Sequence, residues 1–538
     1  MAKNMIKNII NKDLGSSIFF ELLTVYTLFI LLISSGFFSK YTIHMEIFAL
    51  IIAIFGIFII GKNIDNYKSE LLENKYIHIQ LLLIALSLIF LLRAVPYINN
   101  DIPLGYDTGL YKYAIENGLK NLNPWIISSV EPGFLYIMTF IDLILPINFI
   151  LIWLFILFNV LLGFSIYLVT KEYYNKTAGL IAIFIYALSI VQFKVFELMY
   201  YKNIIALSLM MFAFYFLKKE IKYSNYYFIV LGVLIGVIHR PTFYIFGLSY
   251  FIYSFSSPYN IDKKKYDIKL LKNNIISGVI ILVLALIPYL GDFRPAILNM
   301  IDPVVSSITS PGESPGTFIN FFTYQFTTLA YIPFALLGLF YSIRKKDFNI
   351  LFIMSIILGV IVYFQLFFFN RFIIFLDIGL IILASIGAIT IINEKKKLGI
   401  AILLLLLIAM SYSALNYSIK AKPLVDKDEL DIIEKLNSIP TNSYVLSTSS
   451  YYGPWVQGYG ASNVITPGFL DIDFHNRNEW NSFWKSKDKE EIKAFVSSYP
   501  KPLYIFIGKR QNDNIAVLDE CVLLLYENEN NKIYKYTC

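Results

Sequence analysis

Charged residues are scarce in this chain of 538 residues. Asp, Glu, Lys and Arg make up 15% of it, whereas 57% of the residues are apolar and the mean hydropathy is +0.62. Many separate apolar stretches of about 16 to 23 residues follow one another, and roughly 20 such residues cross the hydrocarbon core of a bilayer. No water-soluble fold needs so many, so the composition excludes that class and predicts a polytopic α-helical membrane protein.

Other features are missing as well. The first apolar stretch has no small-residue cleavage site and is too long for a signal-peptide core, so we expect a retained first helix. The sequence shows no internal repeat and no low-complexity segment. The net charge is +7, but the lysines form short clusters between apolar stretches. That pattern is typical of cytoplasmic membrane loops and argues against nucleic acid as a partner.

The lysine clusters also predict a topology. We expect about thirteen membrane crossings, near residues 16–38, 43–61, 77–95, 148–170, 177–193, 203–217, 226–238, 241–256, 273–290, 320–343, 348–369, 372–392 and 398–416. The positive-inside rule then places the N-terminus in the cytoplasm and residues from about 420 onward outside. The chain is predicted to be a multi-pass protein of the plasma membrane.

The stretch 95–147 is the first long polar interruption and lies outside in this topology. Its segment 132–146 is apolar enough to be mistaken for a span. Counting it would invert the later topology and move Lys171 and Lys176 to the outer side, against the positive-inside rule. We therefore expect 132–145 to form a helix that lies in the membrane interface.

Two domains are predicted. Residues 1–419 form the membrane domain, and residues 420–538 form a small extracytoplasmic α/β domain. The second domain shows helical patterns at Asp428–Ser438 and Lys487–Ser498, and strand patterns at Ser443–Thr448, Leu503–Ile507, Cys521–Tyr526 and Lys532–Tyr536.

Three carboxylates lie in the first outer loop, at Asp101, Asp107 and Glu131. Acidic groups at a membrane margin are costly unless they are paired, solvated or used, so they mark a candidate reaction site. Asp107 and Glu131 each precede a short amphipathic segment, where a helix cap is the alternative role. Asp101 lies in an Asn-Asn-Asp loop, where solvation is the alternative.

Arginines gather on the outer side against the positive-inside bias. Four of the seven lie near the outer ends of predicted spans: Arg93, Arg240, Arg294 and Arg371. A guanidinium offers a fixed fork of donors that fits phosphate oxygens, so these residues are candidates for binding an anionic ligand. Arg371, in the turn between two spans, is the first candidate. Contact with lipid head groups is the alternative role.

The chain has only two cysteines, Cys521 and Cys538, and both fall in the predicted outer domain. The segment between them reads as two strands joined by a polar turn, which predicts a hairpin. If the turn is centred between Glu529 and Asn530, the cysteines stand directly opposite each other, within reach of a disulfide. Two free thiols are the alternative, since the register could differ by one residue.

Several segments together resemble a known class of enzymes. An acidic residue followed by a tyrosine in DTGLY, with Asp107 and Tyr111, and an acidic-Pro-aromatic segment, EPGFLY, lie in the first outer loop. KEYYNKTAGLIAIFIYALS, GVLIGVIHRPTFYIF and NRFIIFLDIGLIIL follow in order. This series resembles the GT-C class of integral-membrane glycosyltransferases, and within it the protein mannosyltransferase and lipid A aminoarabinose transferase branch. The resemblance covers roughly residues 97–392.

The resemblance implies a GT-C fold and transfer of a sugar from a polyprenyl-phosphate donor to a lipid, glycan or protein acceptor on the outer face. Asp107 is then the candidate base, and Arg371 and Arg240 are candidate phosphate ligands. Tyr106, Tyr111 and His239 are candidate substrate-binding residues. Asp101 and Glu131 would position the acceptor or hold a divalent cation, Mg²⁺ or Mn²⁺; scattered carboxylates are a weak metal signal, and no cofactor is firmly predicted.

The chain departs from the family pattern at two places. Asp107 is followed by Thr108 where the family usually has Asp-Glu, and Pro132 is followed by Gly133 where the family usually has Pro-Pro. The second carboxylate would then come from Asp101 or Glu131. The first two spans lie outside the matched region.

Two other functions stay open. An oligosaccharyltransferase-like enzyme would share the fold, and YYGPWVQGYG, residues 451–460, faintly resembles the Trp-Trp-Asp signature of that family but lacks its Asp and its paired Trp. A transporter would be expected to have symmetric halves and discontinuous helices near the midplane. The sequence indicates neither, and charged residues deep within the spans are few.

Overall fold

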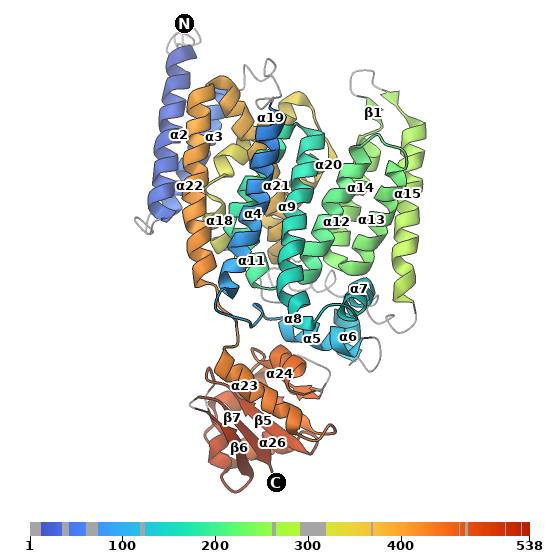
Figure 1. Ribbon diagram of the computed structural model, residues 1–538, viewed down its shortest axis with the longest axis vertical. Coiled ribbons are helices and arrows are strands. Elements are labelled where there is room, and N and C mark those ends of the chain that lie inside the picture. The colour runs from blue at the N-terminus through green and yellow to red at the C-terminus, as the bar shows by residue number, and fades with distance from the viewer. Residues whose placement is uncertain are drawn as a thin grey trace.

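Long apolar helices stand side by side in one bundle, and a small sheet lies beyond one end of it (Figure 1). The computed structural model describes residues 12–34, 42–60, 74–118, 124–260, 265–290, 319–366, 369–461, 463–468, 472–511, 513–528 and 530–538. The bundle is held by one large core of buried apolar side chains that extends from the first described helix to the last bundle helix.

The bundle consists of helices that run mostly along one axis. They are α2 (Lys12–Ser34), α3 (Thr42–Ile60), α4 (Lys75–Ala94), α9 (Phe155–Tyr173), α10 (Lys176–Leu188), α11 (Ile190–Glu197), α12 (Tyr201–Lys218), α13 (Ser224–Ile238), α14 (Arg240–Ser256), α15 (Ile268–Leu286), α18 (Phe321–Thr328), α19 (Ile332–Lys345), α20 (Ile350–Tyr363), α21 (Phe369–Glu394) and α22 (Lys396–Lys420). A short hairpin, β1 (Tyr259–Asn260) with β2 (Lys265–Tyr266), precedes α15, and η5 (Ile287–Tyr289) follows it.

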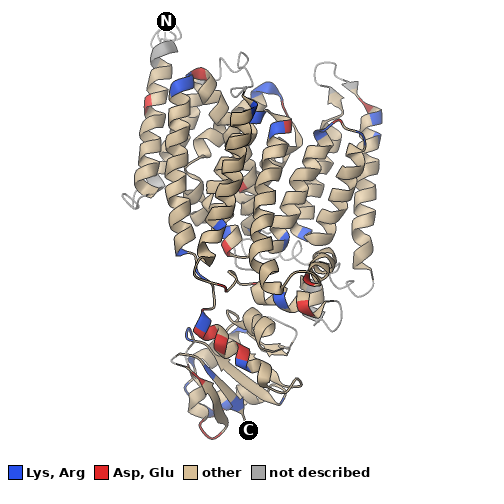
Figure 2. Ribbon diagram, in the orientation of Figure 1, with Lys and Arg blue, Asp and Glu red and all other residues tan. Residues whose placement is uncertain are grey.

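Within the described residues, six helices are long and apolar enough to cross a membrane, or up to eight if each bent pair counts as one span. Charged residues of the bundle lie mostly near its two ends and are sparse between them (Figure 2). Both observations fit a multi-pass membrane protein. The number of thirteen crossings and their direction stay predictions.

Two pairs of these helices are separated by sharp bends, although no discontinuous helix was predicted from the sequence. α10 and α11 meet at a bend of 52°, and α18 and α19 meet at a bend of 83°. At the first break the Ser189 side chain accepts a hydrogen bond from the Gln192 backbone and thus caps α11 inside an apolar stretch. A single serine hardly changes the hydropathy of an apolar stretch. This is why the sequence predicts one continuous span over residues 177–193.

Several short elements lie across the end of the bundle that faces the sheet. They are η3 (Val95–Tyr97), α5 (Thr108–Asn117), α6 (Pro124–Ser129), α7 (Pro132–Asp142) and α8 (Ile147–Phe149), and the π-helical turn η4 (Ile150–Leu154) leads from them into α9. α7 lies across this end rather than along the bundle axis (Figure 1), as expected for the apolar segment 132–145. We call this the site end of the bundle.

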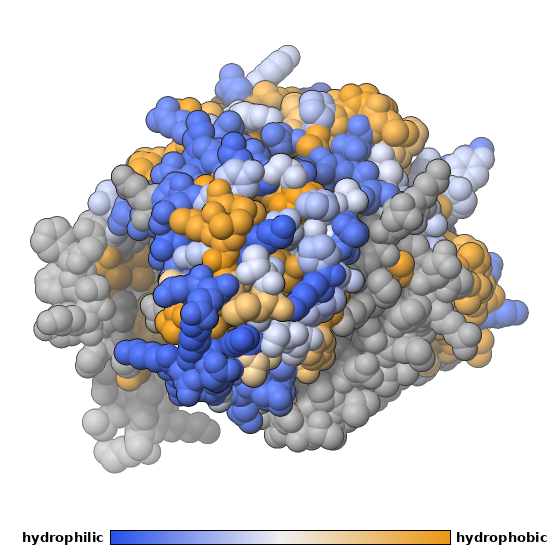
Figure 3. All heavy atoms as spheres, turned by 90° about the horizontal axis from the view of Figure 1, so that it is seen from below, coloured by the Kyte–Doolittle hydropathy of each residue, from blue (hydrophilic) through white to orange (hydrophobic). Residues whose placement is uncertain are grey.

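The C-terminal part, residues 421–538, contains a mixed five-stranded sheet in the order β4-β3-β5-β7-β6. Its elements are α23 (Lys427–Lys435), η7 (Leu436–Ser438), β3 (Tyr444–Ser447), α24 (Gly453–Tyr459), β4 (Val464–Ile465), α25 (Arg477–Lys485), α26 (Lys489–Ser497), β5 (Leu503–Ile507), η8 (Ile515–Leu518), β6 (Val522–Glu527) and β7 (Lys532–Tyr536). One apolar cluster joins the sheet to α23 and α24, and another joins it to α25 and α26. Its surface is mostly hydrophilic with scattered apolar patches when seen from this end (Figure 3).

The predicted hairpin is present as β6 and β7, and Cys521 is bonded to Cys538 in a disulfide with the Cα atoms 5.0 Å apart. The predicted register is wrong at this end. Tyr526 pairs with Ile533 as expected, but an irregularity between Leu524 and Tyr526 shifts the pairing by one residue. A β-bulge places an extra residue on one strand, so the two cysteines are not directly opposite each other.

Candidate active site

Two left-handed turns pack together at the site end and place the loop before α5. Gly105 has φ +86°, and a Cβ atom added to it would lie 2.3 Å from Cβ of Met199, which itself has φ 59°. Only glycine adopts this backbone and tolerates this approach without strain. The contact fixes the turn between α11 and α12 beside Tyr106 and Asp107.

Asp107 occupies the N-cap position of α5, as its sequence context predicts, but its side chain makes no capping hydrogen bond. The half-buried carboxylate instead interacts electrostatically with Lys202 and Arg371. Burial raises the pKa of Asp107, and the two cations lower it only in part, so its pKa stays above the ordinary value. Asp107 is therefore a carboxylate that is not used as a cap and that faces two positive charges.

Glu131, at the N-cap position of α7, is also free of a capping role. Its Oε2 accepts a hydrogen bond from Nζ of Lys202 at 2.6 Å, and its Oε1 accepts from Nε of Arg240 at 3.3 Å. Burial alone would raise the pKa of Glu131, but Lys202 and Arg240 outweigh it and hold the pKa well below the usual range. Lys202 also donates to the Ser129 carbonyl at 2.9 Å. Glu131 thus fixes two cations with its two oxygens.

Gly133 explains one departure from the family pattern. A Cβ atom at this position would lie 2.7 Å from the carbonyl oxygen of Val237 and 2.5 Å from its Cγ2. A larger residue would push α7 away from the end of α13. The glycine therefore brings Glu131, two residues earlier, within reach of Arg240, which opens the following helix α14.

Arg371 lies in the first turn of α21, not in the turn before it. It interacts electrostatically with Asp107 and with Tyr200, the residue before α12. The structure thus brings Asp107, Glu131, Lys202, Arg240 and Arg371 together at the site end, and we call these five residues the charged cluster. Three fixed cations face two carboxylates, which leaves a net positive field suited to an anionic ligand.

The other predicted site residues at this end pack around the charged cluster. Nδ1 of His239 lies 2.7 Å from the Thr242 hydroxyl, and burial lowers the pKa of this histidine. Tyr111 is buried against the rings of Phe134 and Tyr201. Both residues interact electrostatically with Glu131 and Arg371.

Three predicted candidates are not placed in the charged cluster. Arg93 is fully buried between bundle helices, where its Nε donates to the Asn159 side chain at 3.1 Å and its guanidinium lies over the Tyr186 ring. Asp101 is exposed, and no contact among the described residues joins it to the cluster. Arg294 lies outside the described residues. Arg93 therefore packs against Asn159 and Tyr186 inside the bundle and is not part of the charged cluster.

Sequence reasoning missed Lys202 and Tyr200. A signal was present: in the predicted topology Lys202 precedes the span 203–217 on the outer side, against the same rule that singled out the arginines. Applying the argument to lysines as well as arginines would have found it.

The C-terminal part touches α5 directly. A Cβ atom on Gly109 would lie 1.9 Å from the carbonyl oxygen of Pro454, and one on Gly458 would lie 2.2 Å from the carbonyl oxygen of Gly109. The Tyr106 hydroxyl donates to the Ser450 carbonyl at 2.6 Å. Glycines on both sides allow α24 and α5 to approach at backbone distance. The segment 450–458 therefore helps to hold the helix that begins at Asp107.

No group of three or more His, Cys, Asp or Glu side chains that could hold a metal ion occurs in the part of the chain that the structure describes. Both carboxylates of the charged cluster already face cations. The divalent cation considered from the sequence stays untested.

Comparison with known proteins now defines the class. Residues 129–290 match the family model described as dolichyl-phosphate-mannose-protein mannosyltransferase. This segment begins two residues before Glu131 and includes Lys202 and Arg240. The resemblance to GT-C glycosyltransferases is confirmed, and the matches indicate a membrane glycosyltransferase.

Two solved structures share the fold. The apo oligosaccharyltransferase of Archaeoglobus fulgidus is 15% identical, with a TM-score of 0.59 over 87% of this chain and 75% of that one. Apo ArnT of Cupriavidus metallidurans is 10% identical, with a TM-score of 0.53 over 85% of this chain and 97% of that one. At such identities the likeness shows the GT-C fold alone. No curated relative matches the sequence.

Proposed function

We propose that the chain transfers a sugar from a polyprenyl-phosphate donor to an acceptor at the extracytoplasmic face, with inversion at the anomeric carbon. The observation that carries the proposal is Asp107, a carboxylate with no capping bond that faces Lys202 and Arg371 at the site end. A base beside fixed cations is what attack on a phosphate-linked sugar requires.

In the proposed reaction the acceptor hydroxyl attacks the anomeric carbon of the donor sugar. Asp107 takes the hydroxyl proton as the new bond to oxygen forms. The bond between the anomeric carbon and the phosphate oxygen breaks, and the electron pair leaves with the lipid phosphate. Arg371 and Lys202 stabilise that growing negative charge, because fixed cations in a partly buried site need no reorganisation as the charge develops.

Glu131 has a supporting role in this proposal. It holds Lys202 and Arg240 through hydrogen bonds of 2.6 and 3.3 Å, so the cations are in place before the donor arrives. Because side chains supply the positive charge, we expect transfer to continue after chelation of Mg²⁺ or Mn²⁺ with EDTA. Loss of transfer on chelation, with recovery when either ion is added back, would assign a divalent cation to the site.

The donor class is supported by the proteins that share the fold. The archaeal oligosaccharyltransferase has been solved with an inhibitory peptide and a dolichol-phosphate, and ArnT has been solved with undecaprenyl phosphate. By this analogy the partners of the present chain are a polyprenyl-phosphate sugar, membrane lipids and a lipid, glycan or protein acceptor. The site end and the C-terminal part would then lie outside the plasma membrane, with the N-terminus inside.

A second candidate is oligosaccharyltransferase-like transfer to a peptide. The position of α24 favours it, because that helix carries the segment resembling the family signature and packs on α5 next to Asp107. A peptide acceptor bound along α24 would be close to the base. The missing Asp and second Trp of that signature favour the first proposal.

Mass spectrometry of outer-surface glycans tests the function. We compare cells that lack the gene with cells that carry the wild-type chain or Asp107→Asn. The proposal expects one sugar to disappear from a lipid, glycan or protein in both deficient strains, while the lipid-linked donor accumulates. Unchanged glycans together with an unchanged donor pool would contradict it.

A further inference from the structure

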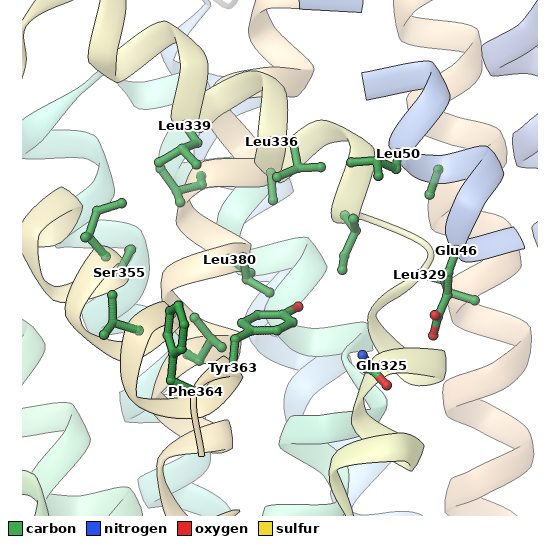
Figure 4. A pocket seen from close by; sticks show the side chains of 18 residues that line it. Glu46, Leu50, Gln325, Leu329, Leu336, Leu339, Ser355, Tyr363, Phe364 and Leu380 are labelled. Carbon is green, nitrogen blue, oxygen red and sulfur yellow. The ribbon is translucent and has the colours of Figure 1, made fainter. Parts of the chain in front are cut away.

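A cavity of about 540 Å³ lies within the bundle, away from the charged cluster. Its walls come from α3, α18, α19, α20 and α21 (Figure 4). Its size falls within the range of about 300 to 1,000 Å³ that is typical of pockets for small molecules. α3 belongs to the N-terminal region for which the family resemblance offers no role.

The cavity has a polar side and an apolar side. The side chains of Glu46, Gln325 and Tyr363 bring their polar groups to one side, and leucines such as Leu336 and Leu339 line another part (Figure 4). Glu46 lies in the first turns of α3 and Tyr363 ends α20. The polar side therefore lies toward the site end of the bundle, and the leucines lie deeper along α19.

Glu46 interacts electrostatically with Tyr363, but two of the three polar groups on this side have no hydrogen-bonding or oppositely charged partner in the part of the chain that the structure describes. Within the described residues, Glu46 makes no hydrogen bond or ion pair, and neither does the side-chain amide of Gln325. A carboxylate on a predicted membrane helix is costly unless a ligand or another charge compensates it. Such a residue marks a candidate binding site, and the cavity beside it supplies the space.

The shape and the charge together define the ligand. A mostly apolar cavity within a membrane bundle suits a hydrocarbon chain, and a carboxylate at its polar side attracts a cation and repels a phosphate. The donor phosphate belongs with the charged cluster, where the field is positive. We propose that this cavity binds one chain of a bilayer lipid whose ammonium head group pairs with Glu46.

The test uses the full chain in detergent and native mass spectrometry. The probes are phosphatidylethanolamine and phosphatidic acid with identical acyl chains. The wild type is expected to retain phosphatidylethanolamine in preference to phosphatidic acid. Glu46→Gln should reduce that preference about tenfold, because the amide keeps the shape of the side chain but loses the negative charge that pairs with the ammonium group.

A cavity-filling variant tests the chain site separately. Gly359 lines the cavity, and a Cβ atom added to it meets nothing within 4 Å. Gly359→Leu should therefore fill the cavity without a clash and lower retention of both lipids by at least about tenfold. Gly247→Leu is the matched control, because Gly247 on α14 also has open space within 4 Å but lies outside the cavity.

Two outcomes would overturn the proposal. Equal lipid retention by Gly359→Leu and Gly247→Leu would show that no chain enters the cavity. Equal retention of the two probe lipids by the wild type, unchanged in Glu46→Gln, would show that Glu46 does not select lipids by their head group. Neither outcome depends on sugar transfer, so the test stands apart from the proposed catalytic function.

Discussion

Glu131 and Asp377 are both buried carboxylates, but their partners differ in kind. Glu131, 2% exposed at the site end, is paired with the cations of Lys202 and Arg240. Asp377, fully buried on α21, accepts hydrogen bonds from three neutral groups and from no cation among the described residues: Ser189 and Gln192 at 2.9 Å each, and the Tyr331 hydroxyl.

The kind of partner distinguishes a carboxylate of the candidate site, Glu131, from a carboxylate that holds helices together, Asp377. Ser189 and Gln192 belong to the break between α10 and α11, and Tyr331 lies at the break between α18 and α19. Asp377 therefore ties two helix breaks to α21, six residues after Arg371 on the same helix. Glu131 instead holds two cations of the charged cluster. We expect Asp377 to matter for the fold, and Glu131 to matter for the chemistry as well.

The largest effect is expected for Glu131→Gln. This change removes the carboxylate that accepts hydrogen bonds from Lys202 and Arg240, and removing one partner of a buried ion pair costs about 3 to 5 kcal/mol. The free energy of unfolding should fall by that amount in detergent, and transfer should fall at least about a hundredfold because the cations are displaced.

Glu116→Gln is the control for this change. Glu116 lies on α5 in an exposed pair with Lys112, and such helix pairs contribute about 0.3 to 0.5 kcal/mol. If Glu131→Gln changed stability and transfer as little as the control does, the ion pairs would have no role in the site.

Arg371→Lys should have a smaller effect. Lysine keeps the charge but lacks the planar fork that binds two phosphate oxygens at once. We expect the dissociation constant of the polyprenyl-phosphate donor to rise about tenfold, in line with one lost charged hydrogen bond. Donor binding is measured by titration of the purified chain. An unchanged dissociation constant would leave Arg371 with a head-group contact only.

Asp377→Asn should have the smallest effect on transfer and a measurable one on stability. The amide accepts fewer hydrogen bonds than the carboxylate, so one of the three donors loses its partner at a cost of about 1 to 3 kcal/mol. Thermal unfolding in detergent reports this loss, and kcat should stay within about threefold of the wild type. A variant of normal stability without transfer would give Asp377 a role in the chemistry and remove the functional difference between Asp377 and Glu131.

The sequence predicted much of the architecture because hydropathy and charge act over long stretches. The interfacial helix, now α7, and the strands β5, β6 and β7 lie where the patterns placed them. The carboxylates of the first outer loop were singled out by the cost of placing charge at a membrane margin. Four outer arginines were singled out because they run against the positive-inside bias. Four of the five residues of the charged cluster, Asp107, Glu131, Arg240 and Arg371, belong to that set, and they come from segments far apart in the sequence.

The remainder depends on contacts that no local pattern encodes. The break at Ser189 needs only one serine in an apolar stretch. The bulge near Leu524 adds one residue to a segment that still reads as a single strand in the sequence. The buried position of Arg93 follows from Asn159 and Tyr186 on other helices. The approach of Gly109 to Gly458 joins residues more than 300 positions apart.

The pH dependence of transfer follows from the environment of Asp107. Burial raises its pKa, with Lys202 and Arg371 opposing that shift only in part. A general base acts when deprotonated, so kcat/KM should fall as the pH drops through this raised pKa. The acid limb is therefore expected above the ordinary aspartate value of about 3.9.

The most direct test of the account is kcat/KM for Asp107→Asn with a polyprenyl-phosphate sugar donor, measured beside Glu116→Gln from the same helix. The account predicts a loss of at least about a hundredfold for Asp107→Asn, the usual scale of general-base work, with donor binding retained and no comparable loss in the control. Turnover near the wild-type level in Asp107→Asn would remove this carboxylate from the mechanism and contradict the proposed site.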